Sequence, residues 1–224
     1  MKKSSFILVL FFNFLAFSQP TVSKTIGEFS KLKVYDLINV ELIQSLENKI
    51  EISGENAKSV SIIQKNNTLK IRMVVSKYFK GEDTFVKLFY KKVNTIDVNQ
   101  GAKVVSYMPI QQYEVELKAQ EGGKITVPVN TKVLTIKSVT GGRIQVQGTT
   151  KTQNININTG GVYKGEKLQA QSSIIKINTG GSAEVRSSDL LDVKIFAGGY
   201  LTVFGKTTNT KQKNIFWGKI IYKD

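Results

Sequence analysis

The stretch Ile157-Asn158-Thr159-Gly160-Gly161 returns 20 residues later as Ile177-Asn178-Thr179-Gly180-Gly181. Further glycine pairs lie on both sides of these two copies at spacings of 18 to 19 residues: Gly122-Gly123, Gly141-Gly142 and Gly198-Gly199. Gly101-Ala102 precedes the first pair by 21 residues and resembles a degenerate copy. A short, nearly fixed period of this kind is typical of a repeat architecture.

Aligned on the first glycine of each pair, the repeats show four mostly apolar columns, at three and five residues before it and after it. The column five residues before contains Ile96, Leu117, Ile136, Ile155, Ile175 and Val193, and the column three residues after contains Val104, Ile125, Ile144, Tyr163, Ala183 and Leu201. This alternation predicts two strands with alternate side chains in one core. The glycines then mark a corner that needs a positive φ or has no room for a Cβ.

Two all-β folds fit this pattern, a β-solenoid with one coil per repeat and an antiparallel meander with one hairpin per repeat. Each repeat also carries a third segment with its own inward residue, as Val115, Leu134 and Leu191 indicate. A repeat with three short sides is a coil rather than a hairpin. We therefore predict a β-solenoid, a single-stranded β-helix with right-handed coiling.

The first half of the chain lacks the glycine period and shows irregularly spaced strands, with a hairpin expected at Lys65-Asn66-Asn67-Thr68. We predict an irregular N-terminal β region over residues 19–93 that packs on the solenoid or caps it. The solenoid is expected over residues 94–205 and a capping strand over residues 206–224. Within that last segment, Trp217 is predicted to be a capping core residue rather than a platform for a ligand.

The first 18 residues have the layout of a secretory signal peptide. Lys2 and Lys3 precede an almost wholly apolar run over residues 6–17, and small residues stand at the expected cleavage site after Ser18. The run is shorter than the roughly 20 residues that a membrane span needs, although an uncleaved N-terminal anchor is an alternative. We expect an exported protein, in the periplasm, on the cell surface or secreted, with no transmembrane segment after signal removal.

The chain contains neither cysteine nor histidine. This excludes disulfides, zinc thiolate sites, cysteine nucleophiles and the Ser-His-Asp triad. The acids of the repeat region fall in different columns, so no paired carboxylates and no calcium cluster are expected. We predict no catalytic residue, no metal and no cofactor. Glu166 and Arg186 share a position in adjacent repeats and are predicted to form a surface ion pair.

The balance of charge is strongly basic, with 32 Lys and Arg against 17 Asp and Glu and a net charge of +15. For an exported protein, anionic polysaccharide, lipopolysaccharide or phospholipid surfaces are better partners than nucleic acid. The alternative is that the charge only keeps exposed strands from associating edge to edge.

Two columns concentrate this charge. Four residues before the first glycine stand Lys118, Lys137, Lys176 and Lys194, with Asn156 as a gap and Asp97 in the first copy, and Lys103, Lys124 and Arg143 form a shorter column just after the corner. The candidate binding residues are Lys118, Lys137, Lys176, Lys194, Lys124 and Arg143. Stacked lysines are either a solvated face that opposes aggregation or a track for a polyanion. The repeated Asn-Thr pairs are either a hydrogen-bonded ladder or a polar shelf for sugar hydroxyls.

The segment Phe29-Ser30-Lys31-Leu32-Lys33-Val34-Tyr35-Asp36, with Ile50-Glu51-Ile52-Ser53-Gly54 and the later Thr-Gly-Gly stretches, resembles the head GIN domain proteins, a family called "putative auto-transporter adhesins". The resemblance covers roughly residues 26–205. It implies an envelope or secreted protein of β-helical character and carries over no catalytic residue. The chain lacks the lipid-anchor cysteine of some envelope relatives, which favours a soluble periplasmic or released form.

These observations predict an exported, non-catalytic binding or adhesion module of the cell envelope. Its expected partners are an anionic polysaccharide or envelope surface, or another envelope protein, and not nucleic acid. One alternative is a structural or protein-interaction scaffold that assembles through its ends. The other is a polysaccharide-acting β-helix enzyme.

Overall fold

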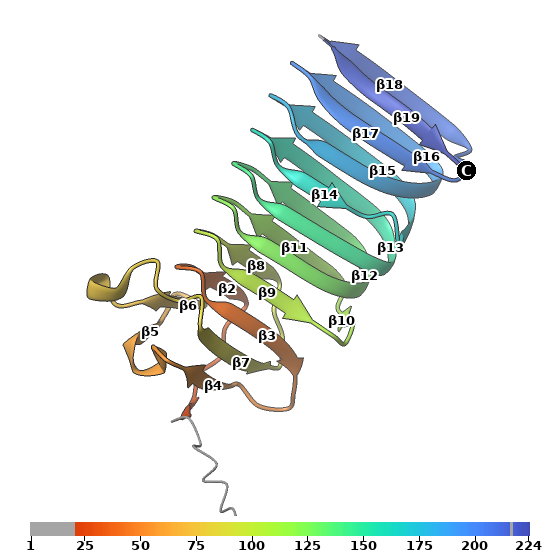
Figure 1. Cartoon of the computed structure of the whole chain (residues 1–224). Helices are drawn as coiled ribbons and strands as arrows, with labels where there is room; N and C mark the ends of the chain where they lie inside the picture. Colours follow the sequence, from red (N-terminus) through yellow and green to blue (C-terminus); the bar gives the residue numbers. More distant parts are fainter. Residues whose placement is uncertain (1–20, 216) are drawn as a thin grey trace, which may run out of the picture.

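A computed structural model describes residues 21–215 and 217–224, so the predicted signal peptide lies outside the described residues. These residues form a β-solenoid of about 7 turns in which 66% of residues are in strands (Figure 1). The predicted all-β solenoid is therefore confirmed. Within the described ranges, no helix has the length and apolar character needed to span a membrane.

The coils from residue 95 onward stack in parallel, each strand pairing with its counterpart one repeat away. Ile125 lies beside Ile144 and Ile136 beside Ile155, so the columns seen in the sequence are stacks of true neighbours. The strands are β8 (Thr95–Val98), β9 (Lys103–Ser106), β10 (Ile110–Gln111), β11 (Glu114–Ala119), β12 (Lys124–Ser138), β13 (Arg143–Asn158), β14 (Val162–Lys164), β15 (Leu168–Asn178), β16 (Ser182–Phe196), β17 (Gly199–Phe204), β18 (Asn209–Ile215) and β19 (Gly218–Lys223).

Each coil has two long sides, which build two sheets around one core. Sheet A contains β8, β11, the second halves of β12, β13, β15 and β16, and β18, whereas sheet B contains β9, the first halves of β12, β13 and β16, and β14, β17 and β19. The long strands pass from sheet B to sheet A through a bend, where the pairing skips Lys132. Val115, Leu134 and Leu191 are fully buried, as the sequence predicts, but they lie in the strands of sheet A and not in the separate third segment that was expected to hold them.

Residues 31–90 add two more coils to the same stack, in an order that differs from the order along the chain. The first coil contains β2 (Lys31–Val34) and β3 (Asn39–Gln44), and the second contains β6 (Thr68–Met73) and β7 (Thr84–Tyr90). β2 pairs in parallel with both β6 and β8, and β3 pairs with both β7 and β9. The first coil is therefore held between the second coil and the coil that starts at residue 95.

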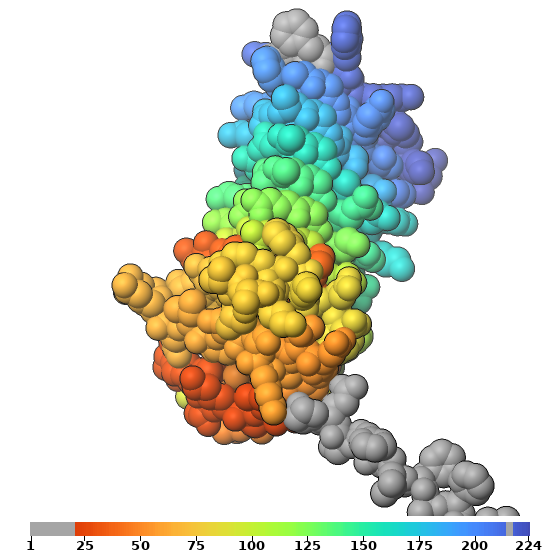
Figure 2. Space-filling view, turned by 60° about the vertical axis from the view of Figure 1, so that its left-hand side comes forward, coloured from red at the N-terminus to blue at the C-terminus, as the bar shows by residue number. Residues whose placement is uncertain are grey.

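Antiparallel strands cover the outer edge of the second coil. β1 (Val22–Thr25) pairs with β4 (Lys49–Gly54), β4 pairs with β7, and β5 (Val60–Lys65) pairs with β6; two short 3-10 turns lie at Ala57–Ser59 and Val75–Lys77. The predicted hairpin is confirmed, because Asn66 and Asn67 both have positive φ between β5 and β6. Together these segments form a broad base below the narrower column of coils (Figure 2).

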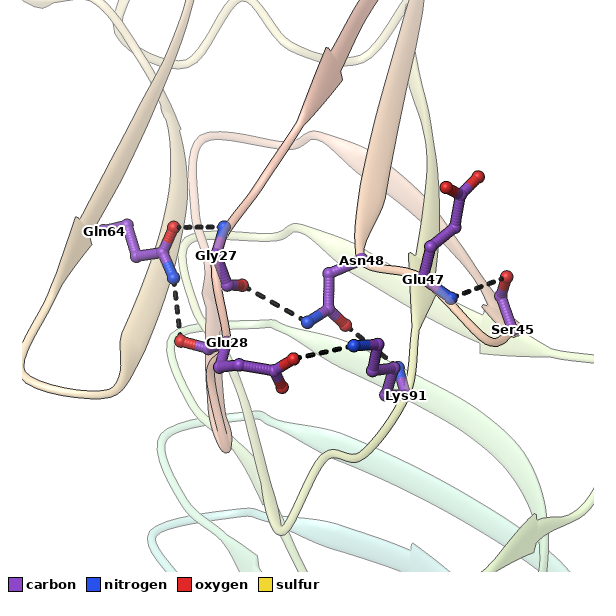
Figure 3. Close-up of polar contacts among 7 residues, drawn as sticks. All are labelled: Gly27, Glu28, Ser45, Glu47, Asn48, Gln64 and Lys91. Carbon is purple, nitrogen blue, oxygen red and sulfur yellow. Dashed lines mark hydrogen bonds and ion pairs between the residues drawn. The ribbon is translucent and has the colours of Figure 1, made fainter.

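Polar side chains fasten the segment between β1 and β2 to this base (Figure 3). Gln64 accepts a hydrogen bond from the Gly27 N–H at 2.9 Å and donates to the Glu28 carbonyl at 2.8 Å. Asn48 donates to the Gly27 carbonyl at 3.3 Å and accepts from the Lys91 N–H at 2.9 Å. The Lys91 ammonium also lies 2.9 Å from the Glu28 carboxylate. The base is thus closed by specific side-chain bonds as well as by strand pairing.

The opposite end of the stack continues the coil pattern. β18 pairs in parallel with β16, and β19 pairs in parallel with β17 with Gly218 beside Gly199. The prediction that Trp217 is a core residue is wrong, because its side chain is 98% exposed. Trp217 occupies the first-glycine position of the last corner, with φ 51°, and a side chain there points away from the core.

The corner itself is a type I′ turn of two residues with positive φ. In Val139-Thr140-Gly141-Gly142, the Gly142 N–H donates to the Val139 carbonyl at 2.9 Å, and Thr140 and Gly141 have φ of 47° and 71°. A Cβ on Gly141 would meet nothing within 4 Å, whereas a Cβ on Gly142 would lie 2.1 Å from the Ala119 carbonyl oxygen of the previous coil. The first glycine therefore supplies the backbone conformation and the second allows the coils to approach.

One polar network is buried in the core. Tyr163 stands in a column of aliphatic residues, and its hydroxyl donates to Gln153 Oε1 at 2.9 Å. Gln153 Nε2 donates in turn to Ser173 Oγ at 2.8 Å, and all three side chains are fully buried. Burial raises the pKa of the Tyr163 hydroxyl, so the group stays protonated and remains a donor.

The two glycines of a corner should respond differently to substitution. Gly142→Ala should lower the free energy of unfolding by about 3 kcal/mol, because the new methyl overlaps a backbone oxygen. Gly141→Asn should cost about 1 kcal/mol or less, because asparagine tolerates the left-handed region and the site is open. Urea unfolding followed by circular dichroism measures both. Equal losses for the two variants would contradict this division.

The buried network gives a second stability prediction. Tyr163→Phe should destabilise the protein by about 1–3 kcal/mol, because Gln153 Oε1 loses its donor while remaining buried. Tyr200→Phe is the matched control, since Tyr200 is 60% exposed, and it should leave the unfolding midpoint unchanged. A Tyr163→Phe variant as stable as its control would show that the network contributes nothing.

Candidate functional site

The predicted lysine column is a continuous row on the outer surface of sheet A. Cross-strand pairing places Lys118 beside Lys137, Lys137 beside Asn156, and Lys176 beside Lys194. The row extends beyond the repeat region in both directions. This lysine row contains, in spatial order, Lys70, Lys33, Asp97, Lys118, Lys137, Asn156, Lys176, Lys194 and Lys213.

Three members of the lysine row escaped the alignment on glycine pairs. Lys33 and Lys70 lie in coils without a Gly-Gly corner, and Lys213 lies in the last coil, where Trp217 replaces the first glycine. Lys33 and Lys70 each stand between buried apolar residues of their strand, whereas Lys213 stands between Gln212 and Asn214. Strand alternation is therefore a signal for Lys33 and Lys70, and only the pairing with Lys194 identifies Lys213.

Carboxylates neutralise the middle of the lysine row, from Lys33 to Lys137. The Glu116 carboxylate forms ion pairs with the ammonium groups of Lys137, at 2.8 Å, and Lys118, at 3.1 Å. The Asp97 carboxylate lies 3.2 Å from the Lys33 ammonium. Burial of the Glu116 carboxylate acts to raise its pKa, but the ammonium groups of Lys137 and Lys118 outweigh it and hold the pKa below its usual value. These lysines are thus already partnered within the chain.

The far part of the lysine row has a different electrostatic character. Among the ion pairs of residues 21–215 and 217–224, none involves Lys176, Lys194 or Lys213. Between Lys137 and Lys176 the shorter Asn156 leaves a hollow of about 230 Å³, which Thr135, Asn154 and Ile174 also line. Apart from Lys70, which lies over the Tyr35 ring, the lysines of this row without an ion pair in the described residues are therefore the three of the C-terminal coils.

The repeated asparagines form the hydrogen-bonded ladder that was one of the two interpretations of this motif. Asn178 donates to Asn158 at 2.8 Å across adjacent coils, and Asn158 donates to Asn156 at 2.9 Å within its own strand. Thr159 and Thr179 have φ of 45° and 51° and belong to the type I′ corners. The motif therefore has a structural role at the corner.

The two remaining candidate residues lie on the other face of the coil. Lys124 and Arg143 are direct neighbours on sheet B, with Lys103 beside Lys124. They project from the surface opposite the lysine row, because the common core separates the two sheets. The six candidate residues therefore form two sets, and one flat partner cannot contact both sets at once.

The predicted ion pair of Glu166 and Arg186 is wrong in its detail. The Arg186 guanidinium donates to the main-chain carbonyl of Glu166 at 3.3 Å, and their side chains form no ion pair in the described chain. Among residues 21–215 and 217–224, no three acidic side chains gather closely enough to hold a metal ion.

Solved structures of similar proteins share this fold. A putative adhesin from Bacteroides fragilis NCTC 9343 aligns with a TM-score of 0.84 at 16% identity, over 93% of this chain and 98% of its own. A putative adhesin from Parabacteroides merdae ATCC 43184 aligns with a TM-score of 0.70 at 20% identity, over 93% of this chain and 98% of its own. A putative lipid binding protein from Parabacteroides distasonis ATCC 8503 aligns with a TM-score of 0.70 at 16% identity, again over 93% and 98%.

At these identities the likeness establishes the fold alone, and no curated protein matches the chain. The family model described as "Putative auto-transporter adhesin, head GIN domain" matches residues 28–207, which is most of the sequence. The coils, the corners and the base all lie within or next to this range. The chain therefore belongs to the head GIN domain family of putative auto-transporter adhesins.

Proposed function

We propose that this protein is an exported, non-catalytic binding and adhesion module of the cell envelope, whose lysine row contacts an anionic envelope surface. Membership of an adhesin-named family supports the binding role and the envelope location. The observation that carries the proposal is the run of Lys176, Lys194 and Lys213, adjacent in register and without ion pairs within the described residues.

The spacing of these lysines favours an extended anionic partner. Neighbouring strands lie about 4.8 Å apart, so the lysine row runs for about 38 Å along the axis. Like charges at this spacing repel one another by a few tenths of a kcal/mol per pair in salt water. An anionic surface relieves that repulsion along the whole row at once. Closer to the base, Glu116 already supplies this compensation, so the C-terminal coils carry the contact.

Removing the three unpaired lysines should weaken binding to an anionic surface. Each lysine near an anionic lipid surface contributes about 1 kcal/mol, so the variant Lys176→Gln/Lys194→Gln/Lys213→Gln should bind roughly 100-fold more weakly. The measurement is cosedimentation with vesicles of phosphatidylglycerol and phosphatidylcholine across a series of salt concentrations. Wild type should lose affinity steadily as salt rises.

The matched control removes the same charge elsewhere. Lys24, Lys58 and Lys65 are exposed lysines of the base, and their triple Gln variant has the same net charge as the test variant. This control should bind nearly as well as wild type. An equal loss of vesicle affinity in both variants would show that only net charge matters. Wild-type binding that does not change with salt would rule out an electrostatic contact.

A second candidate function, a scaffold that assembles through its end, is supported by the open C-terminal coil. β18 pairs only with β16, and β19 pairs only with β17, so each leaves one edge unpaired within the described residues. Lys211, Lys213, Lys219 and Lys223 lie on these strands, and such edge lysines oppose self-association. Screening of these charges should therefore allow two such edges to pair.

Sedimentation velocity tests this second candidate. If edge lysines alone hold copies apart, high salt should produce concentration-dependent dimers of wild type. A protein truncated after Gly205 should also form dimers, through the edges that the truncation exposes. A monomer at every salt and protein concentration would exclude assembly through identical ends and leave only a heterologous partner.

A further inference from the structure

A shallow trough runs along the outer surface of sheet B, on the opposite face from the lysine row. Its floor is a column of outward-facing side chains in adjacent strands, with Val105 beside Thr126 and Thr126 beside Gln145. Three hollows of about 350, 210 and 240 Å³ follow one another along it. The first two hollows share Val105 and Tyr107, and the last two share Thr126 and Gln145, so they form one groove.

Basic residues line the side of the groove nearest the glycine corners. Lys103, Lys124 and Arg143 stand in adjacent strands along that side, and Lys164 follows Gln145 at the far end of the floor. Lys87 and Glu41 lie at the other end, where Glu41 is the only acid among the lining residues. None of these five cations takes part in an ion pair within residues 21–215 and 217–224. The groove is thus strongly positive and available to an anion.

The end of the groove nearest the base carries exposed aromatic rings. Tyr107 is 77% exposed and Phe85 is 54% exposed, and both line the largest of the three hollows. Exposed rings of this size are costly to leave in water and serve as flat apolar platforms in binding sites. Side-chain amides and hydroxyls of Asn39, Thr126, Gln145 and Gln147 supply neutral hydrogen-bonding groups along the groove.

We infer that this groove binds an extended acidic polysaccharide, with carboxylate or sulfate groups on the basic side and a sugar ring against Tyr107 and Phe85. The groove crosses six strands, from β7 to β14, and so extends for about 24 Å at about 4.8 Å per strand. Its shallow, elongated form fits several residues of a polymer. The charge complementarity selects an acidic chain.

An acidic peptide fits this groove less well. Extended peptides are usually held by main-chain hydrogen bonds to a free sheet edge. The strands of the groove floor are paired on both sides with neighbouring coils, so no free edge is offered there. A ligand must therefore be held by side chains, and a sugar polymer presents hydroxyls and acidic groups along its whole length for that purpose.

This inference rests on the proposed function in that both require exposure to the envelope, but it concerns a separate surface. The test titrates oligogalacturonates of increasing length into the intact protein by isothermal calorimetry. Affinity should rise with length until the ligand spans the groove and then level off. Fully methyl-esterified oligomers, which lack the charge, should bind at least tenfold more weakly.

Variants separate the two surfaces. Tyr107→Ala and Arg143→Gln alter exposed groove residues and should each lower oligogalacturonate affinity about tenfold, while vesicle binding stays near the wild-type value. Tyr113→Ala is the matched control, because Tyr113 is 74% exposed but lies outside the groove. The triple Gln variant of Lys176, Lys194 and Lys213 should retain oligogalacturonate binding.

Several results would overturn the inference. Wild type that binds no oligogalacturonate, or groove variants that bind as wild type does, would remove the site while leaving the vesicle result of the lysine row untouched. Loss of oligogalacturonate binding in the lysine-row variant alone would assign the sugar to sheet A. Equal or tighter binding of poly-glutamate, lost in the same groove variants, would replace the polysaccharide with an acidic peptide.

Discussion

The whole architecture depends on the corner at which each coil turns from sheet A to sheet B. Two successive residues in the left-handed region reverse the chain, and the next position packs so closely under the previous coil that only a glycine fits at Gly123, Gly142 and Gly161. This contact fixes the register between coils, since a slip of one residue would turn every core side chain outward. Because the register is fixed, residues at equivalent positions of successive repeats stack in a row along the axis of the solenoid.

The glycine signal explains why the second half of the fold was predictable and the first half was not. In the first coil the same turn is made by Asp36 and Leu37, with φ of 59° and 64°, and Ile38 takes the place of the crowded glycine. The buried Asp36 carboxylate accepts a hydrogen bond from the Met73 N–H at 3.0 Å, which ties this corner to the second coil. Without glycines, these residues show only ordinary strand alternation, so their membership of the stack was hidden in the sequence.

For the candidate surfaces, the sequence predicts which lysines lie in one row but not which of them form ion pairs. The period places Lys118, Lys137, Lys176 and Lys194 in one row, which pairing confirms. The Glu116 side chain neutralises Lys118 and Lys137. Its position depends on side-chain packing, which the spacing of the repeats does not reveal. The groove on sheet B was equally invisible, because Glu41 and Val105 meet across 64 residues of sequence. The aromatic-rich segment around Trp217 suggests a core residue, but a corner position directs this side chain outward.

The interposed first coil divides the molecule into a closed base and an open column. Its two faces are both occupied, by strands whose paired residues come 37 to 64 residues later in the chain, so the base is assembled only after residues 68–106 have been made. Duplicating a segment within residues 31–90 would separate partners that must touch. Duplicating one glycine-marked repeat would only insert another coil above the base, in the same register. The length of the protein, and with it the length of the lysine row, is therefore adjustable by whole repeats within the column but not within the base.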